Sequence, residues 1–324
     1  GLVGSEMCIR DSYMVGAQLE GFDCMVKITN DNDFMILEGD EYLSSPIDLR
    51  SKFLLYQPNI ALISGIAWDH INVFKTFDDY VEQFRKFVAS ITPGGVLVYN
   101  EEDAEVVKVV ESAENYFRKI PYHTPDYEIV DGIINLKTDM GEIPLSVFGK
   151  HNLLNMEGAR FICSQLGIME EEFYEAIMSF KGASKRLEKV ERQDGGLLYK
   201  DFAHAPSKVK ATVAAFAEQF EKTETFGFLE LHTYSSLNPV FLEQYDHAMD
   251  GLDNAVVFYS EDALKIKRME PISPELIKEK FKNENLKVFT NAEDLHQYWE
   301  TLDKSKGAFL MMSSGNFGGL DLTK

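Results

Sequence analysis

Three carboxylates follow the apolar segment 34–37: Glu38, Asp40 and Glu41. Carboxylates this close together repel one another unless a cation lies among them, and Mg²⁺ binds one or two carboxylates together with water and phosphate oxygens. If 34–37 is a strand, these side chains lie beyond its carboxyl end, where open parallel sheets bind their ligands. They are therefore candidates for a metal site, and a solvated acidic turn explains them equally well.

A second pair of potential ligands, Asp69 and His70, follows the apolar segment 60–66. A single histidine is more often structural than a ligand. Here, however, two successive buried strands are expected to end in acidic or imidazole side chains, and their ends can meet at one edge of a sheet. This joint pattern favours a metal site that contains Glu38 and His70.

An imidazole and two amides lie at the start of a predicted long helix. His151, Asn152 and Asn155 are part of "GKHNLLN", and helical spacing brings Asn152 and Asn155 to one face. An amide offers a donor and an acceptor together, as binding to the edge of a purine requires. Capping of the helix by Asn152 or a neighbour is the simpler explanation of the same residues.

Arg186, Asp201 and His204 are potential phosphate-binding residues. Arg186 lies in the polar segment 181–188, a plausible linker, where a guanidinium either reaches a phosphate or is simply solvated. Asp201 and His204 lie between a predicted strand and the start of a helix, a position where sheets bind ligands and helix N-termini bind anions. Helix capping by Asp or Ser is the alternative.

Two further predicted strands end in segments rich in hydroxyl groups or glycine. The first carries His232, Ser235 and Ser236, and the second, "MSSGNFGG", carries Ser314 and Asn316. Hydroxyls and backbone N–H groups in such turns can bind a carboxylate. Plain surface loops have a similar composition, so the alternative stays open.

These residues need a scaffold, and the apolar periodicity predicts alternating strands and helices. The alternation predicts α/β domains with mostly parallel sheets and helices on both faces, plus a small antiparallel piece over 122–149. The predicted strands are 24–28, 34–37, 60–66, 96–100, 197–202, 225–231, 254–260, 287–290 and 307–314. The predicted helices are 77–91, 103–114, 151–168, 170–180, 206–220, 239–249, 273–281 and 292–302.

The composition of the 324 residues is that of a globular chain with a net charge of −21. This acidic excess disfavours binding to nucleic acid, which needs clustered Lys and Arg. The three cysteines show no paired spacing, which disfavours a disulfide framework and indicates a reducing compartment such as the cytoplasm. No apolar segment approaches the roughly 20 residues of a membrane span, so no membrane association is expected.

Taken in order, the motifs resemble those of the Mur ligases of peptidoglycan synthesis. "EGDEY" resembles the family's E-x-D-E segment, "WDH" its magnesium-binding D-H segment, and "GKHNLLN" its G-x-H-N-x-x-N adenine segment. "KRLE" resembles its interdomain Arg motif, and "DFAHAPSKV" its D-x-x-H-x-P motif. The ordered series is a far more specific signal than any single motif.

The resemblance implies a cytoplasmic, ATP-dependent, ADP-forming ligase that uses Mg²⁺ and forms an amide bond. It implies a catalytic set of Glu38, His70, Arg186 and His204, in which Glu38 and His70 bind Mg²⁺. The residues implied for ATP are His151, Asn152 and Asn155 along the adenine, with Arg186, Asp201 and His204 at the ribose or phosphates. The residues implied for the incoming peptide are His232, Ser235, Ser236, Ser314 and Asn316.

The segments "DEY", "DFAHAP" and "SGNFGG" favour one branch of the family. That branch joins UDP-N-acetylmuramate to the murein tripeptide L-alanyl-γ-D-glutamyl-meso-diaminopimelate, and a UDP-N-acetylmuramate–L-alanine ligase is the alternative. Phe84 stands where other branches carry a carbamylated Lys, which fits both. A folate–peptide ligase of the same superfamily is disfavoured by "DFAHAP".

The resemblance also divides the chain. Residues 1–12 resemble a translated adapter sequence, 13–183 correspond to a truncated central ATP-binding domain, and 184–324 to a Rossmann-like α/β ligase domain. The family's phosphate-binding G-x-x-G-K-[ST] loop has no counterpart here, and in the family it lies upstream of the position of Tyr13. We therefore expect this chain alone to be inactive, and an inactive fragment with residual nucleotide binding is a further alternative.

Overall fold

The computed structural model describes residues 12–16, 24–30, 32–68, 71–192 and 196–322. The chain divides between Ser184 and Lys185 into two compact units, called unit 1 and unit 2 here. This division lies one residue from the boundary that the sequence predicts.

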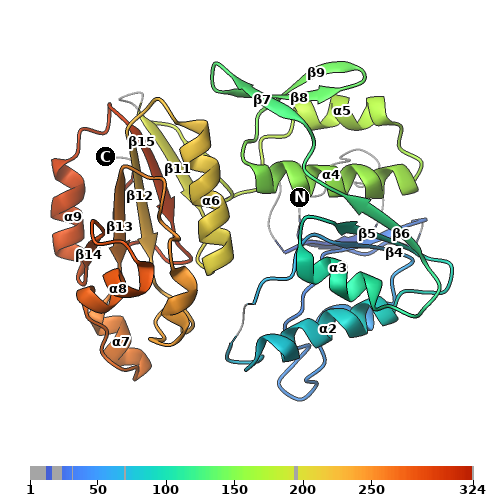
Figure 1. Ribbon diagram of the computed structural model, residues 1–324, viewed down its shortest axis with the longest axis horizontal. Helices are drawn as coiled ribbons and strands as arrows, with labels where there is room; N and C mark the ends of the chain where they lie inside the picture. The colour runs from blue at the N-terminus through green and yellow to red at the C-terminus, as the bar shows by residue number, and fades with distance from the viewer. Residues whose placement is uncertain (1–11, 17–23, 31, 69–70, 193–195, 323–324) are drawn as a thin grey trace. The chain divides into compact units, whose positions relative to one another are not determined.

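Unit 1 is built around a three-stranded parallel sheet with the strand order β4-β5-β6 (Figure 1). Successive side chains of a strand point to opposite faces, so Leu97 and Val98 of β5 enter different cores. Helices α2 and α3 pack on the Leu97 face, and α4 packs on the Val98 face. The bounds are Ile60–Ile63 (β4), Val96–Asn100 (β5), Arg118–Tyr122 (β6), Phe77–Ala89 (α2), Ala104–Glu111 (α3), Lys150–Gln165 (α4) and Glu170–Met178 (α5).

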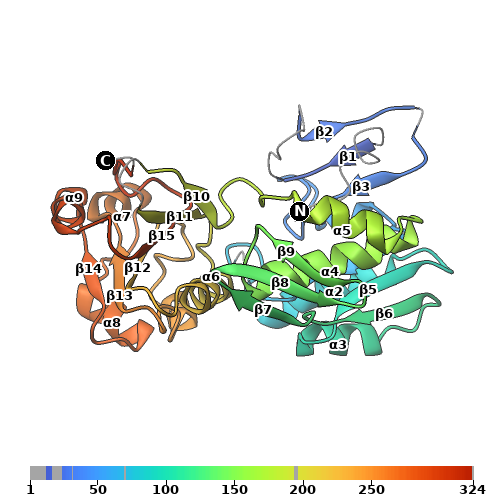
Figure 2. The same ribbon diagram turned by 90° about the horizontal axis from the view of Figure 1, so that it is seen from above.

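Two smaller sheets complete unit 1 (Figure 2). Strand β8 pairs antiparallel with β7 and β9, which confirms the small antiparallel piece predicted over 122–149. Strand β1 pairs antiparallel with β2 and parallel with β3. The bounds are Ser12–Met14 (β1), Val26–Lys27 (β2), Met35–Leu37 (β3), Tyr127–Val130 (β7), Ile133–Thr138 (β8) and Gly141–Leu145 (β9), with a 3-10 turn, η1, at Lys52–Leu55.

Segments 34–37 and 60–66 were expected to be successive buried strands. This expectation is wrong for 34–37, which forms β3. Strand β3 pairs with β1 rather than with β4, and Met35 in it is 51% exposed. The ends of β3 and β4 are therefore not brought together by a shared sheet, as the metal-site prediction assumed.

Unit 2 contains a six-stranded sheet with the order β10-β11-β15-β12-β13-β14. All neighbours pair in parallel except β10, which runs antiparallel along one edge. The last strand in the sequence, β15, lies between β11 and β12 in the sheet. The bounds are Glu188–Val190 (β10), Leu197–Asp201 (β11), Thr225–Glu230 (β12), Asn254–Phe258 (β13), Lys287–Phe289 (β14) and Ala308–Met312 (β15).

Helices cover both faces of this sheet (Figure 1). On one face Leu198 lies in a core with Trp299 of α9. On the other face the ring of Tyr199 lies 5.8 Å from that of Phe216 in α6. This arrangement confirms the predicted α/β class. The bounds are Pro206–Gln219 (α6), Phe241–Tyr245 (η2), Glu261–Lys267 (α7), Pro274–Phe281 (α8) and Ala292–Thr301 (α9).

The predicted helix 239–249 is wrong in type and length, because the segment forms only the short 3-10 helix η2. The amide of Asn238 accepts the N–H groups of Val240 and Phe241, and His247 has a positive φ of 55° that ends any helical continuation. Five elements among the described residues were not predicted, namely β1, η1, β6, β10 and α7. The last three have a common reason. Their sequences, "RKIPY", "EKV" and "EDALKIK", are rich in charge and show little apolar periodicity.

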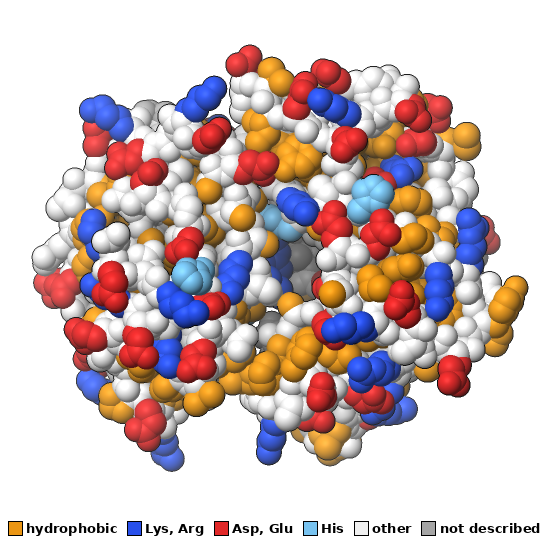
Figure 3. Space-filling view, viewed as in Figure 1, with side chains coloured by type: hydrophobic (Ala, Val, Ile, Leu, Met, Phe, Trp, Pro, Cys, Tyr) orange, Lys and Arg blue, Asp and Glu red, His pale blue; other side chains and the backbone are white. Residues whose placement is uncertain are grey.

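Acidic and basic side chains are interspersed on the face shown in Figure 3, with no broad basic patch on it. Among the described residues, none of the helices has the length and apolar character needed to span a bilayer.

Candidate active site

The three carboxylates after β3 have different partners. The N–H of Gly16 donates to Oε2 of Glu38 at 2.6 Å. Asp40 pairs with Lys52 at 2.5 Å, and this hydrogen bond raises the pKa of Lys52. The hydroxyl of Tyr80 donates to Oε1 of Glu41 at 2.9 Å. Two of the carboxylates are thus bound to protein side chains, and the exposed Glu38 is the one best suited to a cation.

The predicted metal site is only partly within the described residues. Asp69 and His70 lie outside them, so the pairing of Glu38 with His70 stays a prediction. Across the described ranges, no group of three or more His, Cys, Asp or Glu side chains is arranged to hold a metal ion. Glu38 alone offers one carboxylate, which fits Mg²⁺ only when phosphate oxygens and water supply the other ligands.

The predicted adenine residues lie in the first two turns of α4. The helix is capped by Gly149, which has a positive φ of 93° and makes no side-chain capping bond. Asn152 does not cap the helix, because its Nδ2 donates to the carbonyl of Phe148 at 2.8 Å. His151 is half-buried and Asn155 is exposed. Of the two amides, Asn155 is the one more open to a ligand.

Unit 2 brings its predicted residues to one edge of its sheet. The register places Asp201 of β11 opposite Met312 of β15, and Met312 opposite Leu229 of β12. The carboxyl ends of these three neighbouring strands are therefore level. The segments that follow them carry the predicted residues His204, His232, Ser235, Ser236, Ser314 and Asn316.

Asp201 is buried, and backbone donors occupy both of its carboxylate oxygens. The N–H of Leu187 donates to Oδ2 at 2.8 Å, and the N–H of Ala203 donates to Oδ1 at 2.6 Å. Arg186 is exposed, with its guanidinium 5.6 Å from the centre of the Phe202 ring. Asp201 thus connects Leu187, near the start of unit 2, to β11 by a hydrogen bond. This structural role was not predicted from the sequence.

His204 lies in the turn between β11 and α6. Its Nδ1 donates to the carbonyl of Phe202 at 2.9 Å, and its own carbonyl accepts the hydroxyl of Tyr245. Ala205 is the N-cap of α6 and gives no side-chain capping bond. Capping by Asp or Ser is therefore wrong, and the first turn of α6 keeps backbone donors that suit an anion.

The segment after β12 is ordered by a turn between Thr233 and Ser236. The Oγ of the buried Ser236 accepts the N–H of Thr233 at 2.9 Å, and Oγ1 of Thr233 accepts the N–H of Ser236 at 3.1 Å. Ser236 therefore supports the loop, whereas Ser235 is half-exposed and the side chain of His232 is 48% exposed.

The segment after β15 offers polar groups at the same edge. The Oγ of Ser314 is buried and has no hydrogen-bond partner among the described residues, and Asn316 is exposed. Both side chains are compatible with a ligand at this edge.

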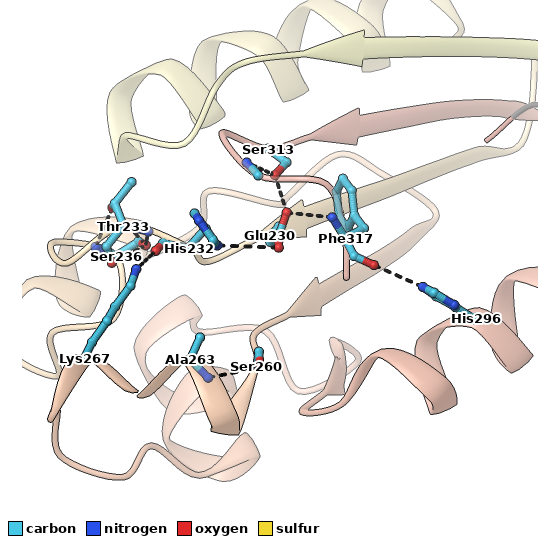
Figure 4. Close-up of polar contacts among 11 residues, drawn as sticks. Glu230, His232, Thr233, Ser236, Ser260, Ala263, Lys267, His296, Ser313 and Phe317 are labelled. Carbon is cyan, nitrogen blue, oxygen red and sulfur yellow. Dashed lines mark hydrogen bonds and ion pairs between the residues drawn. The ribbon is translucent and has the colours of Figure 1, made fainter. Parts of the chain in front are cut away.

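Glu230, at the end of β12, was missed by the sequence analysis. It is a buried carboxylate in the strand "TFGFLE", all of whose residues are buried. Figure 4 shows it between Ser313, Phe317 and His232. The signal that would have found it is the single charge at the end of an otherwise uncharged buried strand, since a buried charge needs specific partners.

A separate cavity of about 400 Å³ lies in unit 1 beside β8, α4 and α5. Its lining includes Glu157, Arg160 and Tyr174, with Arg160 paired to Glu157 at 2.5 Å. Burial raises the pKa of Tyr174 to about 12. None of the predicted site residues lines this cavity.

The Mur ligase middle domain family matches residues 20–163. This segment is therefore similar to the middle domain of the Mur ligases. The match covers α2, α3 and the parallel sheet of unit 1, together with Glu38, His70 and the first turns of α4.

Curated Mur ligases are similar to the chain over much of its length. A UDP-N-acetylmuramate–L-alanine ligase from Desulfitobacterium hafniense is 27% identical over 231 residues, which cover 68% of this chain and 51% of that protein. A second ligase of the same name, from Caldicellulosiruptor bescii, is 28% identical over 71% of this chain and 51% of its own length. The chain thus spans about half the length of these relatives.

Solved Mur ligase structures have the same fold. A murein peptide ligase from Psychrobacter arcticus has a TM-score of 0.62 and 18% identity, over 96% of this chain and 70% of that one. The MurF ligase from Thermotoga maritima in complex with ADP has a TM-score of 0.68 and 16% identity, over 98% and 73% of the two chains. At these identities the likeness shows the fold alone.

Proposed function

We propose that the chain is part of an ATP-dependent, ADP-forming ligase that joins UDP-N-acetylmuramate to the murein tripeptide. The observation that carries the proposal is the order of its parts. A Mur ligase middle domain over 20–163 is followed by an α/β unit whose predicted residues lie along one sheet edge. Since ATP and a UDP-sugar are the proposed substrates, the reaction is placed in the cytoplasm.

The proposed nucleotide residues are those that the resemblance implies. His151, Asn152 and Asn155 would bind the adenine, with Asn155 best exposed for it. Arg186 and the turn of His204 would bind phosphate, supported by the backbone donors at the start of α6. Asp201 would act mainly by holding Leu187, next to Arg186, in place.

Glu38 would hold Mg²⁺ together with His70, as a hard cation with phosphate oxygens among its ligands. When bound, Mg²⁺ neutralises charge on the phosphates. The proposed role of Glu38 and His70 is to hold the cation in a fixed position beside the phosphates.

The chemistry proceeds in two steps. A carboxylate oxygen of UDP-N-acetylmuramate attacks the γ-phosphorus of ATP, the bond to the bridging oxygen breaks, and ADP leaves an acyl phosphate behind. The acceptor amine then attacks the acyl carbon, inorganic phosphate leaves, and the nitrogen loses a proton. Because phosphoryl transfer depends on positioning and on stabilising spread negative charge, a site with few nucleophilic side chains is sufficient.

The acceptor has two candidates. The segments "DFAHAP" and "SGNFGG" support the tripeptide. The names of the curated relatives support L-alanine as the second candidate. Both use the same acyl phosphate and differ only in the amine.

The test is a ligase assay of the complete gene product and of the 324-residue chain, with ADP release and product mass measured for the tripeptide and for L-alanine. Glu38→Ala is expected to lower turnover at least about 100-fold, by loss of charge stabilisation at the phosphates. Asp33→Ala, an exposed acid just before β3, is the matched control. In the complete gene product, equal turnover for both variants, or no ADP release with either acceptor, would falsify the proposal. The 324-residue chain alone is expected to be inactive.

A further inference from the structure

The carboxylate of Glu230 is a buried charge beside the proposed acceptor residue His232. The residue is 5% exposed at the carboxyl end of β12, the strand between β13 and β15. A carboxylate removed from water is tolerated only when donors or opposite charges compensate it. The partners of Glu230 therefore show what the charge is used for.

One oxygen of Glu230 organises the segment 313–317 that follows β15 (Figure 4). Its Oε2 accepts the hydroxyl of Ser313 and the N–H of Phe317, the latter at 2.8 Å. A Cβ on Gly315 would lie only 2.7 Å from the same oxygen, so the backbone passes close to the carboxylate. The segment that carries Ser314 and Asn316 therefore contacts the Glu230 carboxylate at three of its residues, Ser313, Gly315 and Phe317.

Further contacts fix the same segment from its outer side. Phe317 is buried, and its carbonyl accepts a hydrogen bond from Nε2 of His296 in α9 at 3.1 Å. The N–H of Gly315 donates to Oγ of Ser313 at 2.7 Å. The conformation of 313–317 therefore depends on Glu230 at its centre and on α9 at its rim.

The other oxygen of Glu230 faces the proposed acceptor histidine. Oε1 lies 3.8 Å from Nδ1 of His232. At this distance the contact is electrostatic rather than a hydrogen bond. A negative charge on this side of the ring attracts the proton to Nδ1, which leaves the lone pair on Nε2, at the opposite side of the ring. His232 is held from a second side, because its carbonyl accepts a hydrogen bond from Nζ of Lys267.

Lys267 adds a positive charge to this cluster. Burial lowers the pKa of Lys267, and attraction to Glu230 acts in the opposite direction. Its ammonium also lies 5.1 Å from the centre of the Tyr234 ring. The carboxylate of Glu230 thus connects the segment after β15 with the segment after β12.

We propose that Glu230 is the positioning residue of the acceptor site. Its carboxylate holds segment 313–317 in place and orients His232 so that the Nε2 lone pair accepts a hydrogen bond from the incoming amine. The inference rests on the proposed function for the identity of the acceptor, and its structural part can be tested without ligase activity.

The first test compares Glu230→Gln with Glu230→Ala in the full chain. The glutamine keeps an oxygen for Ser313 and Phe317 but presents N–H to Nδ1 of His232, so it should preserve the segment and reverse the tautomer. The imidazole ¹⁵N shifts at about pH 8.5, where a histidine is neutral, report the tautomer. We expect a proton on Nδ1 in the wild type and on Nε2 in Glu230→Gln, and the same tautomer in both overturns the proposal.

Glu230 is proposed both to hold segment 313–317 and to orient His232. Hydrogen exchange of the Phe317 amide measures the first of these two effects by itself. Exchange should be at least tenfold faster in Glu230→Ala and near the wild-type rate in Glu230→Gln. Glu221→Gln, an exposed acid in the turn before β12, is the matched control and should change nothing. Unchanged exchange in Glu230→Ala overturns the proposal.

Calorimetry with the tripeptide, with L-alanine and with ADP tests the link to the acceptor. We expect at least tenfold weaker acceptor binding in Glu230→Gln, with ADP binding unchanged. Equal acceptor affinity in wild type and variant overturns the inference and leaves the proposed function standing. If the wild type binds neither acceptor, the inference about Glu230 is wrong. If it also fails to bind ADP, the proposed function is wrong as well.

Discussion

Asp201 illustrates how one carboxylate can serve the fold within a site that also needs chemistry. Its two backbone partners are Leu187, close to the start of unit 2, and Ala203, which follows β11. Both hydrogen bonds are buried, so removal of the acceptor leaves two N–H groups without compensation. A loss of activity on mutation of Asp201 would therefore not by itself indicate contact with the nucleotide.

Asp201→Ala is expected to lower the free energy of unfolding by about 1–3 kcal/mol, because buried donors lose their acceptor. Urea unfolding of the full chain in a Trp68→Phe background, in which Trp299 is the remaining tryptophan, measures the change by fluorescence. Asp262→Ala, whose side chain is 83% exposed, is the control and should stay within about 0.5 kcal/mol of the wild type. Equal stability of the two variants would contradict the structural role of Asp201.

The candidate residues differ in how far sequence alone could place them. His204, His232 and Ser314 were expected at strand ends, and they do follow neighbouring strands of one sheet. Glu230 was missed because a single charge at the end of an apolar strand carries no periodic signal. The Leu187 partner of Asp201 was missed because a hydrogen bond between residues 14 positions apart depends on the tertiary fold.

At the scale of elements, β15 is inserted into its sheet with the help of a glycine. Gly307 precedes β15 and has a positive φ of 90°, and a Cβ there would lie 2.8 Å from the carbonyl oxygen of Glu224. The neighbouring Ala308 donates its N–H to the same carbonyl at 2.8 Å. The close approach of two backbones therefore requires a residue without a side chain.

Gly307→Ala is expected to destabilise the protein by more than about 1 kcal/mol, since backbone strain and a backbone clash add together. Gly319→Ala is a matched control, because Gly319 has a similar φ of 88° but no atom within 4 Å of the added Cβ. Thermal unfolding of both variants isolates the cost of the clash. If the two melting temperatures coincide, the close approach at Gly307 is not required.

Helices α6 and α8 are linked through one acid. Asp246, just after η2, pairs with Lys210 of α6 at 2.8 Å and with Lys282, the residue after α8, at 3.1 Å. These hydrogen bonds, first that of Lys210 and then that of Lys282, lower the pKa of Asp246 from 3.8 to about 2. The side chain is 37% exposed, so solvent screening keeps the contribution near 0.5 kcal/mol.

Because the folded pKa of Asp246 lies below the unfolded one, its pairing stabilises the fold above about pH 4 and is lost as the pH falls through about 2. Asp246→Asn should therefore destabilise the protein at pH 7 and have almost no effect at about pH 2. Urea unfolding at both pH values measures the difference, with the exposed Glu284→Gln as control. An equal loss of stability at both pH values would show that the effect of Asp246→Asn does not come from its ion pairs.

The elements show which patterns are readable without tertiary information. Helix α2 was predicted within two residues at its C-terminal end, because Tyr80, Phe84 and Phe87 recur at helical spacing on one buried face. Strand β10 was not predicted, since its sequence "EKV" is two-thirds charged and it is a strand only through pairing with β11. The placement of β3 with β1 depends on residues far from 34–37 in the chain, which no local pattern records.

At the scale of the whole molecule, the boundary at Ser184 and Lys185 lies in an exposed stretch with three basic residues. Lys181, Lys185 and Arg186 are all exposed. Limited trypsin digestion should therefore cut first within 181–186 and yield two products that correspond to the two units. Mass spectrometry of the early products measures this, and first cuts inside either unit would contradict two independent cores.

The place of β15 has a consequence for how the chain acquires its structure during translation. Strands β11 and β12 cannot pair with each other, because β15 separates them in the finished sheet. When residues up to β14 have emerged from the ribosome, β15 is still missing. The edges of β11 and β12 that face it therefore keep backbone N–H and C=O groups without strand partners until residues 308–312 emerge. Unit 2 is thus expected to complete its sheet late, and chaperones that shield exposed strand edges would act on it in that interval.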